Sequence, residues 1–254
     1  MGWCGILSPM TTHPEAQPEP PPERTTRRRS LVKLGGAVAA ALGAGAWEAS
    51  SEADAAGNGP AAVAAGLVTC VLTPEQTEGP YYIDGAKLRR DVREGRPGAP
   101  LTLRTTVLDV STCKPVQGAS VEIWHCDAEG VYSGVDQQQT VGEMFLRGVQ
   151  KTDAKGVATF VTIFPGWYPG RTVHIHTMVH LGGNVVHTGQ LYFTEKATRA
   201  IYANAPYRRR AAARETTNAN DSIYRNGGSK SVVRMSRRAS GAYTGTITMG
   251  VARS

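Results

Sequence analysis

The chain has 254 residues, of which 41% are hydrophobic and 19% charged, and it contains 29 Gly and 15 Pro. This length supports one good core and excludes two large domains plus tails, while the glycine and proline content favours turns and short strands over long helices. The formal net charge of +7 is uneven, because residues 1–58 carry −1 and the remainder carries +8. A basic body attracts nucleic acid, anionic polymers or carboxylated small molecules, but no nucleic-acid motif surrounds Arg208–Arg210, and solvation of the surface is the simpler interpretation.

Residues 1–58 have the parts of an export leader. Arg28 and Arg29, followed by Ser-Leu-Val-Lys, precede an apolar stretch from Leu34 to Trp47 and a small-residue tail. The arginine pair resembles a twin-arginine signal, the route that exports proteins already folded, often with their metal; an ordinary secretory leader and a basic tail are the alternatives. The apolar stretch is well short of the about 20 residues of a membrane span. We therefore expect a secreted bacterial protein without a stable membrane span, whose true start is Met1 or Met10.

The rest of the chain predicts one strand-rich domain at 72–254 behind a linker at 59–71. Apolar and polar residues alternate in short runs separated by turn residues, and such runs predict strands at Leu101–Val110, Ala119–His125, Gly156–Ile163, Arg171–Leu181, His187–Phe193, Lys230–Arg237 and Tyr243–Val251. We expect Arg147–Lys155 to turn into the next strand, and one helix to run from Glu195 to Ala203 with Thr194 as its N-cap. The predicted fold is mainly β, an antiparallel β-sandwich with long active-site loops and one or two short helices.

The four cysteines limit the possible cross-links. Cys4 falls in the leader, so Cys70, Cys113 and Cys126 allow at most one disulfide. A Cys70–Cys113 bridge is slightly favoured over Cys113–Cys126, and we interpret Cys126 as a buried small hydrophobic residue. A cysteine zinc site is not expected, because the chain has no CxxC pair.

The residues that indicate chemistry gather around one His-x-His pair. His174 and His176 point to the same face of a predicted strand, about 6.6 Å apart along it, which suits two imidazoles on one ion. A Pro/Gly-rich loop just before them can bring Tyr168 over that face, and a second glycine-rich loop carries Tyr132. Each feature alone is weak, and only their conjunction indicates a metal centre. His180 shares the face as a possible third ligand, but we expect it to lie beyond the reach of the metal.

Four motifs resemble those of the intradiol ring-cleavage dioxygenases, the family of the catechol 1,2- and protocatechuate 3,4-dioxygenases. They are LTPEQTEGPYY at 72–82, DAEGVYSG around Tyr132, GWYPGRTVHIH at 166–176 and GQLYF at 189–193. The resemblance covers roughly Leu72 to Phe193, in the order and spacing of the family. It implies that one Fe(III) per chain is held by Tyr132, Tyr168, His174 and His176. It also implies cleavage of catechol-type diols with O2, between the two hydroxyl-bearing carbons, to cis,cis-muconate-type diacids.

The resemblance also implies roles for residues around the metal. Tyr168 is the tyrosinate that leaves the metal when substrate binds, Arg171 stabilises charge beside the substrate ring, and Gln190 forms hydrogen bonds near the same place. Pro80 and Tyr81 line the substrate pocket. The alternative roles are structural: a surface ion pair for Arg171, a strand-end amide for Gln190, and a rigid turn with a packed aromatic ring for Pro80 and Tyr81.

Two other functions compete with this reading. One is a secreted zinc hydrolase with the metal on His174, His176 and His180; the other is a non-catalytic β-sandwich binding domain. The expected partners are a small catechol-type substrate and O2 rather than nucleic acid, and a homo-oligomer is possible. The substituents of the substrate ring stay open. The basic body permits a ring carboxylate, for which Arg147 is a possible partner.

Overall fold

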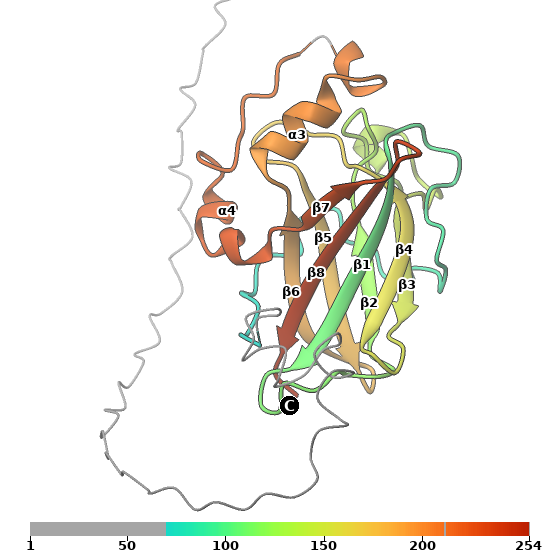
Figure 1. The fold of residues 1–254 in the computed structure, drawn as a ribbon. Helices are drawn as coiled ribbons and strands as arrows, with labels where there is room; N and C mark the ends of the chain where they lie inside the picture. The colour runs from blue at the N-terminus through green and yellow to red at the C-terminus, as the bar shows by residue number, and fades with distance from the viewer. Residues whose placement is uncertain (1–69, 211, 254) are drawn as a thin grey trace, which may run out of the picture. The chain divides into compact units, whose positions relative to one another are not determined.

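The computed structural model describes residues 70–210 and 212–253. The leader at 1–58 and residues 59–69 of the linker lie outside the described residues, so export stays a prediction. Two four-stranded sheets pack face to face as a β-sandwich (Figure 1), which confirms the mainly β fold. Within residues 70–210 and 212–253, no helix has the length and hydropathy needed to cross a membrane.

The two sheets interleave segments that are distant in sequence. Sheet A has the order β4 (Val157–Ile163), β1 (Pro100–Asp109), β8 (Tyr243–Val251), β7 (Arg234–Arg237). Sheet B has the order β3 (Arg147–Lys151), β2 (Ser120–Trp124), β5 (His174–Leu181), β6 (Asn184–Tyr192). All neighbouring strands are antiparallel except β1 and β8, which are parallel. The expected antiparallel sandwich therefore contains one parallel pair.

Most predicted elements form, with shifted ends. The helix α3 (Glu195–Tyr202) begins after Thr194, whose hydroxyl accepts a hydrogen bond from the Ala197 amide at 3.2 Å, as predicted. Strand β3 was missed, because the polar run Arg147–Lys151 shows little alternation. Strand β7 is shorter than predicted, since a 3₁₀ turn, η3 (Gly228–Ser231), occupies its expected start. The short helices α4 (Ser222–Arg225), η1 (Asp136–Gln138) and η2 (Tyr207–Arg209) were not predicted.

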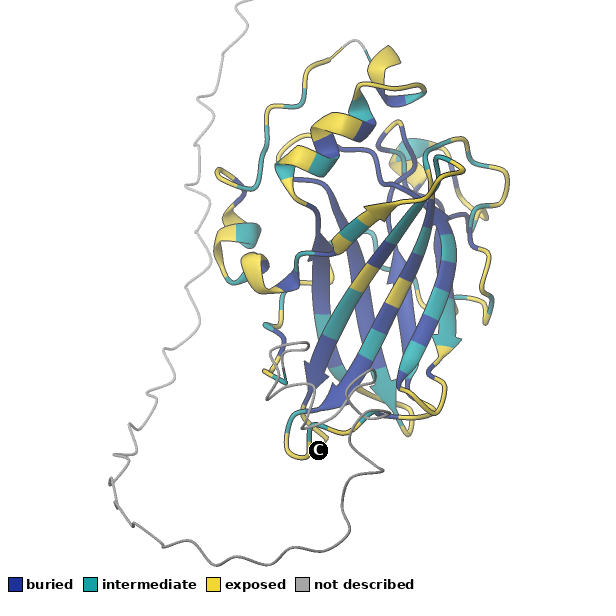
Figure 2. Cartoon of the chain, in the orientation of Figure 1, coloured by how far each residue is buried: buried dark blue, intermediate teal, exposed yellow. Residues whose placement is uncertain are grey.

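The core lies between the sheets and follows the period of two that the sequence shows. Alternate residues of the central strands point into it and are fully buried, among them Leu101, Leu103 and Val107 of β1, Val121 and Ile123 of β2, and Ile175 and Val179 of β5. Burying each such side chain stabilises the fold by about 1.5–3 kcal/mol. Along β1 of sheet A, buried residues alternate with more exposed ones, and β8 also contains both buried and more exposed residues (Figure 2).

One extended segment, residues 73–92, crosses the outer face of sheet B. The Gln76 amide bonds to the Thr188 carbonyl of β6 at 3.0 Å, and Gly79 lies against His176 of β5. The ring of Tyr82 then meets Trp124 at the end of β2, and the Arg89 amide bonds to the Val149 carbonyl of β3 at 3.0 Å. The segment thus contacts the four strands in their order within the sheet, and it buries the outer face on which the paired histidines lie.

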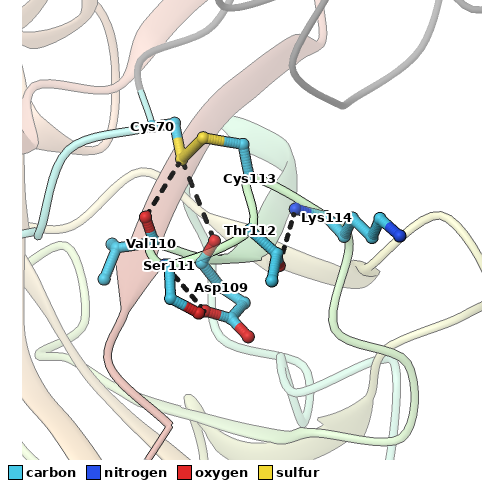
Figure 3. The surroundings of a disulfide bond; sticks show 7 residues. All are labelled: Cys70, Asp109, Val110, Ser111, Thr112, Cys113 and Lys114. Atoms are coloured by element: carbon cyan, nitrogen blue, oxygen red, sulfur yellow. Dashed lines mark hydrogen bonds between the residues drawn. A yellow bond between two sulfur atoms is a disulfide. The ribbon is translucent and has the colours of Figure 1, made fainter.

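A disulfide fixes the start of this segment far from the histidines. Cys70 is bonded to Cys113, which confirms the slightly favoured pairing, and Cys126 is a buried free thiol. The bridge joins Cys70 to the turn after β1, where Asp109 accepts hydrogen bonds from the amide and hydroxyl of Ser111 (Figure 3). Because Pro100 at the start of β1 pairs with Ile163 at the end of β4, the loop carrying Tyr168 leaves the opposite end of sheet A.

Candidate metal centre

The two histidines meet on the outer face of β5. The Nε2 atoms of His174 and His176 are 3.0 Å apart. The Nδ1 atom of His174 is 2.6 Å from the Thr172 carbonyl oxygen, to which it donates, so Nε2 is the free nitrogen. The His176 ring stacks on Trp124, with centroids 5.0 Å apart and planes at 5°, and Nδ1 of His176 is buried without a hydrogen-bond partner. Both rings therefore direct Nε2 to one place.

Tyr168 reaches the same place from the loop between β4 and β5. Its hydroxyl oxygen lies 3.1 Å from Nε2 of His174. The loop is anchored just before the tyrosine: Gly166 donates to the Asp127 carbonyl at 2.9 Å, and the Arg210 guanidinium stacks 4.0 Å from the Trp167 ring centroid. A side chain at 166 would collide with the backbone of 127 and 128. The glycine and proline residues of the motif thus let the loop pack closely enough to turn Tyr168 inward.

Tyr132 approaches from the loop that follows β2. Its ring is fully buried, stacks on Tyr81 with centroids 4.4 Å apart, and meets Tyr168 edge to face at 5.6 Å. Its hydroxyl is buried and has no hydrogen-bond partner in the described structure. An orphaned buried hydroxyl costs about 1–3 kcal/mol, so a partner that the protein itself does not supply is expected at this oxygen.

Burial controls the protonation of all four side chains. Burial, and then the Arg171 charge, lower the pKa of His174 to about 3, and burial with the neighbouring His174 lowers the pKa of His176 well below its usual range. The imidazoles are therefore neutral and free to donate electron pairs. Burial raises the phenol pKa values of Tyr132 and Tyr168, against which Arg171 acts in the opposite direction. Only a strong cation makes these phenols ionise near neutral pH.

Three of the four donor atoms have the spacing expected around one metal ion, and the chemistry of all four suits a hard trivalent ion. Donor atoms about 2.1 Å from one ion and at right angles to each other lie about 3.0 Å apart, which agrees with the 3.0 and 3.1 Å separations at Nε2 of His174. Two neutral imidazoles with two phenolic oxygens, one of them orphaned, suit Fe(III), because phenolate oxygen is a hard anionic donor. That these four residues bind iron stays a prediction.

The other predicted residues flank this cluster. Arg171 donates from Nε to Asp221 at 2.9 Å and from Nη2 to the Gln190 side chain, and Gln190 pairs with His176 across β5 and β6. Tyr81 lies against both tyrosines, while Pro80 is exposed beside it. The structure therefore gathers Arg171, Gln190 and Tyr81 at the cluster, and the pocket role of Pro80 stays a prediction.

Two alternative assignments are wrong. His180 lies apart from the other histidines, with Nε2 3.5 Å from a Glu122 oxygen, and within residues 70–210 and 212–253 no three His, Cys, Asp or Glu residues are placed to share a metal. This contradicts the alternative of a zinc site on His174, His176 and His180. Arg147 is buried and donates to the hydroxyl and carbonyl oxygens of Ser133 at 2.9 and 2.8 Å. It holds the Tyr132 loop and cannot pair with a substrate carboxylate. His125 is buried, and its Nε2 atom is 2.7 Å from the Thr162 hydroxyl.

Three residues near the cluster were not predicted. Asp221 receives Arg171, and Tyr192 donates to the side chains of Gln190 and Gln76 at 3.0 and 2.8 Å. Gln76 lies within the motif at 72–82 and Tyr192 within GQLYF, so both motifs marked the neighbourhood. Asp221 had no motif, although an Asp before a short helix is a common N-cap signal.

Comparisons with known proteins agree with this geometry. A family profile described as Dioxygenase matches residues 77–200. An intradiol ring-cleavage dioxygenase from Tetranychus urticae is 37% identical and covers 72% of this chain and 95% of its own, with a TM-score of 0.67. The dioxygenase domain of a carbohydrate-binding fusion from Streptomyces sp. SirexAA-E is 30% identical over 72% of this chain and 100% of that domain, with a TM-score of 0.56.

A shorter stretch matches a curated relative. Catechol 1,2-dioxygenase 1 of Acinetobacter lwoffii is 37% identical over 101 residues, which are 38% of this chain and 32% of that enzyme. The chain thus spans about a third of that relative. The fold, the order of the motifs and the sequence identity to two solved structures, which extends over nearly their whole length, all indicate the same family. The chain belongs to the intradiol ring-cleavage dioxygenase family.

Proposed function

We propose that the protein is an Fe(III)-dependent enzyme that cleaves catechol-type diols with O2, between the hydroxyl-bearing carbons, to cis,cis-muconate-type diacids. The observation that carries this proposal is that Nε2 of His174 lies 3.1 Å from the Tyr168 oxygen and 3.0 Å from Nε2 of His176, beside the orphaned Tyr132 hydroxyl. Tyr132, Tyr168, His174 and His176 would hold the ion. The chemistry that a bound ferric ion supplies is Lewis acidity toward a chelated diol.

The two tyrosines differ in a way that assigns their roles. Tyr132 is fully buried beneath Tyr81, whereas Tyr168 is only partly buried and lies on a loop with Pro169 and Gly170. Tyr168 is therefore the ligand free to move aside. Because burial raises its pKa, its oxygen holds a proton firmly once it leaves the ion, so it is suited to accept one proton of the diol.

Arg171 supplies positive charge next to the substrate. Its Nε and Nη2 atoms are engaged by Asp221 and Gln190, so Nη1 is the guanidinium nitrogen that neither of these partners holds. A fixed guanidinium beside the ring stabilises the negative charge that develops on the ring carbon that reacts. Trp124, Tyr81 and Tyr82 enclose the cluster with aromatic surface, which keeps water from the reacting atoms.

The carboxylates near Tyr82 favour substrates that carry no negative charge on the ring. Burial, and then Glu122, Asp84 and Glu78, raise the pKa of Tyr82 to about 12. The same negative potential repels a carboxylate on the substrate ring, and Arg147 is not available to compensate it. We therefore propose that catechol and hydroxyquinol are better substrates than protocatechuate.

Oxygen uptake over these three diols, combined with mass and NMR analysis of the products, tests the proposal. We expect one O2 consumed per diol and both of its atoms in an intradiol diacid. Formation of a yellow semialdehyde, or no oxygen uptake by the iron-loaded protein with any diol, would overturn the assignment. Export by the twin-arginine route remains part of the proposal, and it is tested by replacing Arg28 and Arg29 with Lys and measuring secretion.

A further inference from the structure

Arg171 is held in place by a residue 50 positions away in the sequence. Its Nε atom donates to Oδ2 of Asp221 at 2.9 Å, and the Arg171 side chain is only 14% exposed. A buried guanidinium needs a counter-charge and a fixed geometry to avoid a large desolvation cost. Asp221 is the carboxylate that pairs with Arg171, and its own side chain is 0% exposed.

Asp221 is itself rigidly fixed. Its Oδ2 atom also accepts from the Thr172 amide at 2.7 Å, and its Oδ1 atom accepts from the Tyr224 amide at 2.8 Å, which caps α4. Burial alone would raise its pKa, but these amides and Arg171 outweigh burial and lower it. The carboxylate is therefore ionised at neutral pH and is held by three donors from two separate segments.

The opposite side of the guanidinium is fixed as well. Nη2 of Arg171 donates to the Gln190 side-chain oxygen, which also accepts from the Tyr192 hydroxyl at 3.0 Å. The side-chain amide nitrogen of Gln190 donates to the Thr77 carbonyl at 2.9 Å. Two of the three guanidinium nitrogens are thus engaged by fixed partners, and the planar shape of the group then determines the direction of Nη1.

We propose that Asp221 is a positioning residue, whose carboxylate orients Arg171 so that Nη1 faces the bound diol. This inference rests on the proposed function, in which Arg171 acts on the substrate. It assigns the segment around α4, far beyond the four sequence motifs, a part in completing the site. A purely structural role, in which Asp221 only caps α4 and anchors Thr172, predicts a loss of stability without a specific effect on turnover.

The kinetic test compares Asp221→Asn with Glu195→Gln. Both substitutions remove a carboxylate charge paired with an arginine, and Glu195 holds Arg214 and the Asn218 amide in the same C-terminal region without contacting Arg171. In the iron-loaded full chain, Asp221→Asn should lower kcat about tenfold or more with KM changed by less than about threefold. Glu195→Gln should lower the melting temperature and leave kcat within about twofold. Equal effects of the two variants on kcat would overturn the proposal.

A double-mutant cycle separates positioning from stability. Arg171→Lys keeps the positive charge but cannot bond Asp221 and Gln190 together, so it should lower kcat about as much as Asp221→Asn. Adding Asp221→Asn to Arg171→Lys should then cause no further loss, whereas independent losses that multiply would contradict the proposal. If Asp221→Asn does not fold, Arg171→Lys alone tests the proposal. A kcat equal to that of the parent in Arg171→Lys would then show that a fixed orientation of the cation is not needed.

An NMR measurement is independent of turnover. With gallium(III) in place of paramagnetic iron, the Arg171 Nε–H resonance should exchange slowly with water in the parent and at least about tenfold faster in Asp221→Asn. Glu195→Gln should leave the exchange unchanged. If the parent consumes no oxygen with any diol, the proposed function is refuted. Slow exchange of the Arg171 Nε–H in that same protein would still show that Asp221 holds Arg171. Fast exchange in the parent would refute the positioning role.

Discussion

In the part of the chain that the structure describes, the outer face of sheet A carries exposed residues, whereas both faces of sheet B are covered. In β8 of sheet A, Thr246 is exposed between buried or half-buried neighbours, and Arg104 of β1 is likewise exposed. In β5 of sheet B, residues 174–179 are all buried, because residues 73–92 lie across the outward-facing positions. The strands show similar alternation in sequence, yet only the second cover converts outward-facing polar residues into buried ones.

The difference shows where a function is built on a sandwich. An exposed Thr or Arg on sheet A is solvated, and its replacement is expected to change stability by less than about 0.5 kcal/mol. A buried imidazole or phenol on sheet B loses its water and is costly unless something else binds it. The covered face therefore holds the buried Tyr132 hydroxyl without a hydrogen-bond partner, and we propose a metal ion as its partner.

The largest expected effect separates two histidines of the same strand face. His176→Ala should remove the iron and lower oxygen uptake more than about 1,000-fold, because a central donor atom is lost. The matched control is His180→Ala, four residues along the strand, which should keep iron and uptake within about twofold of the parent. Metal analysis and oxygen uptake measure both. Loss of iron from His180→Ala would show that the proposed set of four metal ligands is wrong.

Tyr168→Phe probes the movable ligand on the covered face. The variant should keep its iron but lower kcat about 10- to 100-fold, because no phenolate oxygen remains to accept the proton of the diol. Tyr243→Phe on sheet A serves as the control and should keep normal turnover. Stopped-flow turnover and metal content distinguish the outcomes, and complete loss of metal from the Tyr168 variant would refute its role as the displaceable ligand.

Gly79→Ala tests the contact between the crossing segment and the metal cluster. A methyl group at 79 would lie 3.1 Å from Cε1 of His176, and φ is +72°. Gly85 has a similar φ of +86° but nothing within 4 Å, so Gly85→Ala measures the backbone strain alone. We expect Gly79→Ala to weaken iron binding about tenfold more than Gly85→Ala does, as measured by competition with a chelator. Equal affinities would show that the segment covers His176 without constraining it.

The smallest effect is a dependence of stability on pH at Glu122. Burial, and then Asp84, raise the pKa of this carboxyl from 4.5 to about 7. As pH rises between these values, the unfolded chain releases a proton that the folded chain retains, so stability falls and levels off above pH 7. The free energy of unfolding of Glu122→Gln should therefore exceed that of the parent by up to about 3 kcal/mol at pH 8, and by little at pH 5. Urea titrations at both pH values that gave equal gains would contradict the raised pKa.

The sequence was a good guide to the fold where strands alternate clearly. The strand over Tyr243–Val251 and the helix capped by Thr194 formed as predicted, because local pattern and capping determine both. Strand β3 was missed, since its polar residues become buried only when residues 73–92 and the Tyr132 loop pack on them. The parallel pairing of β1 with β8 was also not predictable, because it depends on the order of the whole sheet.

The site was predictable only in part, for the same reason. His174, His176, Tyr132 and Tyr168 carried motifs, and the structure gathers their rings in one cluster. Asp221 comes close to Arg171 only after the C-terminal segment folds back, a long-range contact without local periodicity. Arg147 was a possible partner for a ring carboxylate from the sequence, and only the packing shows that it is buried.

The central claim is that two tyrosines and two histidines bind one ferric ion on the covered face of sheet B. Metal analysis of the purified protein, together with resonance Raman spectroscopy excited in its visible absorption band, tests it most directly. We expect about one iron per chain and ring vibrations from two tyrosinates, of which only one should remain in Tyr132→Phe. Stoichiometric zinc, or iron bound without any tyrosinate vibration, would contradict it.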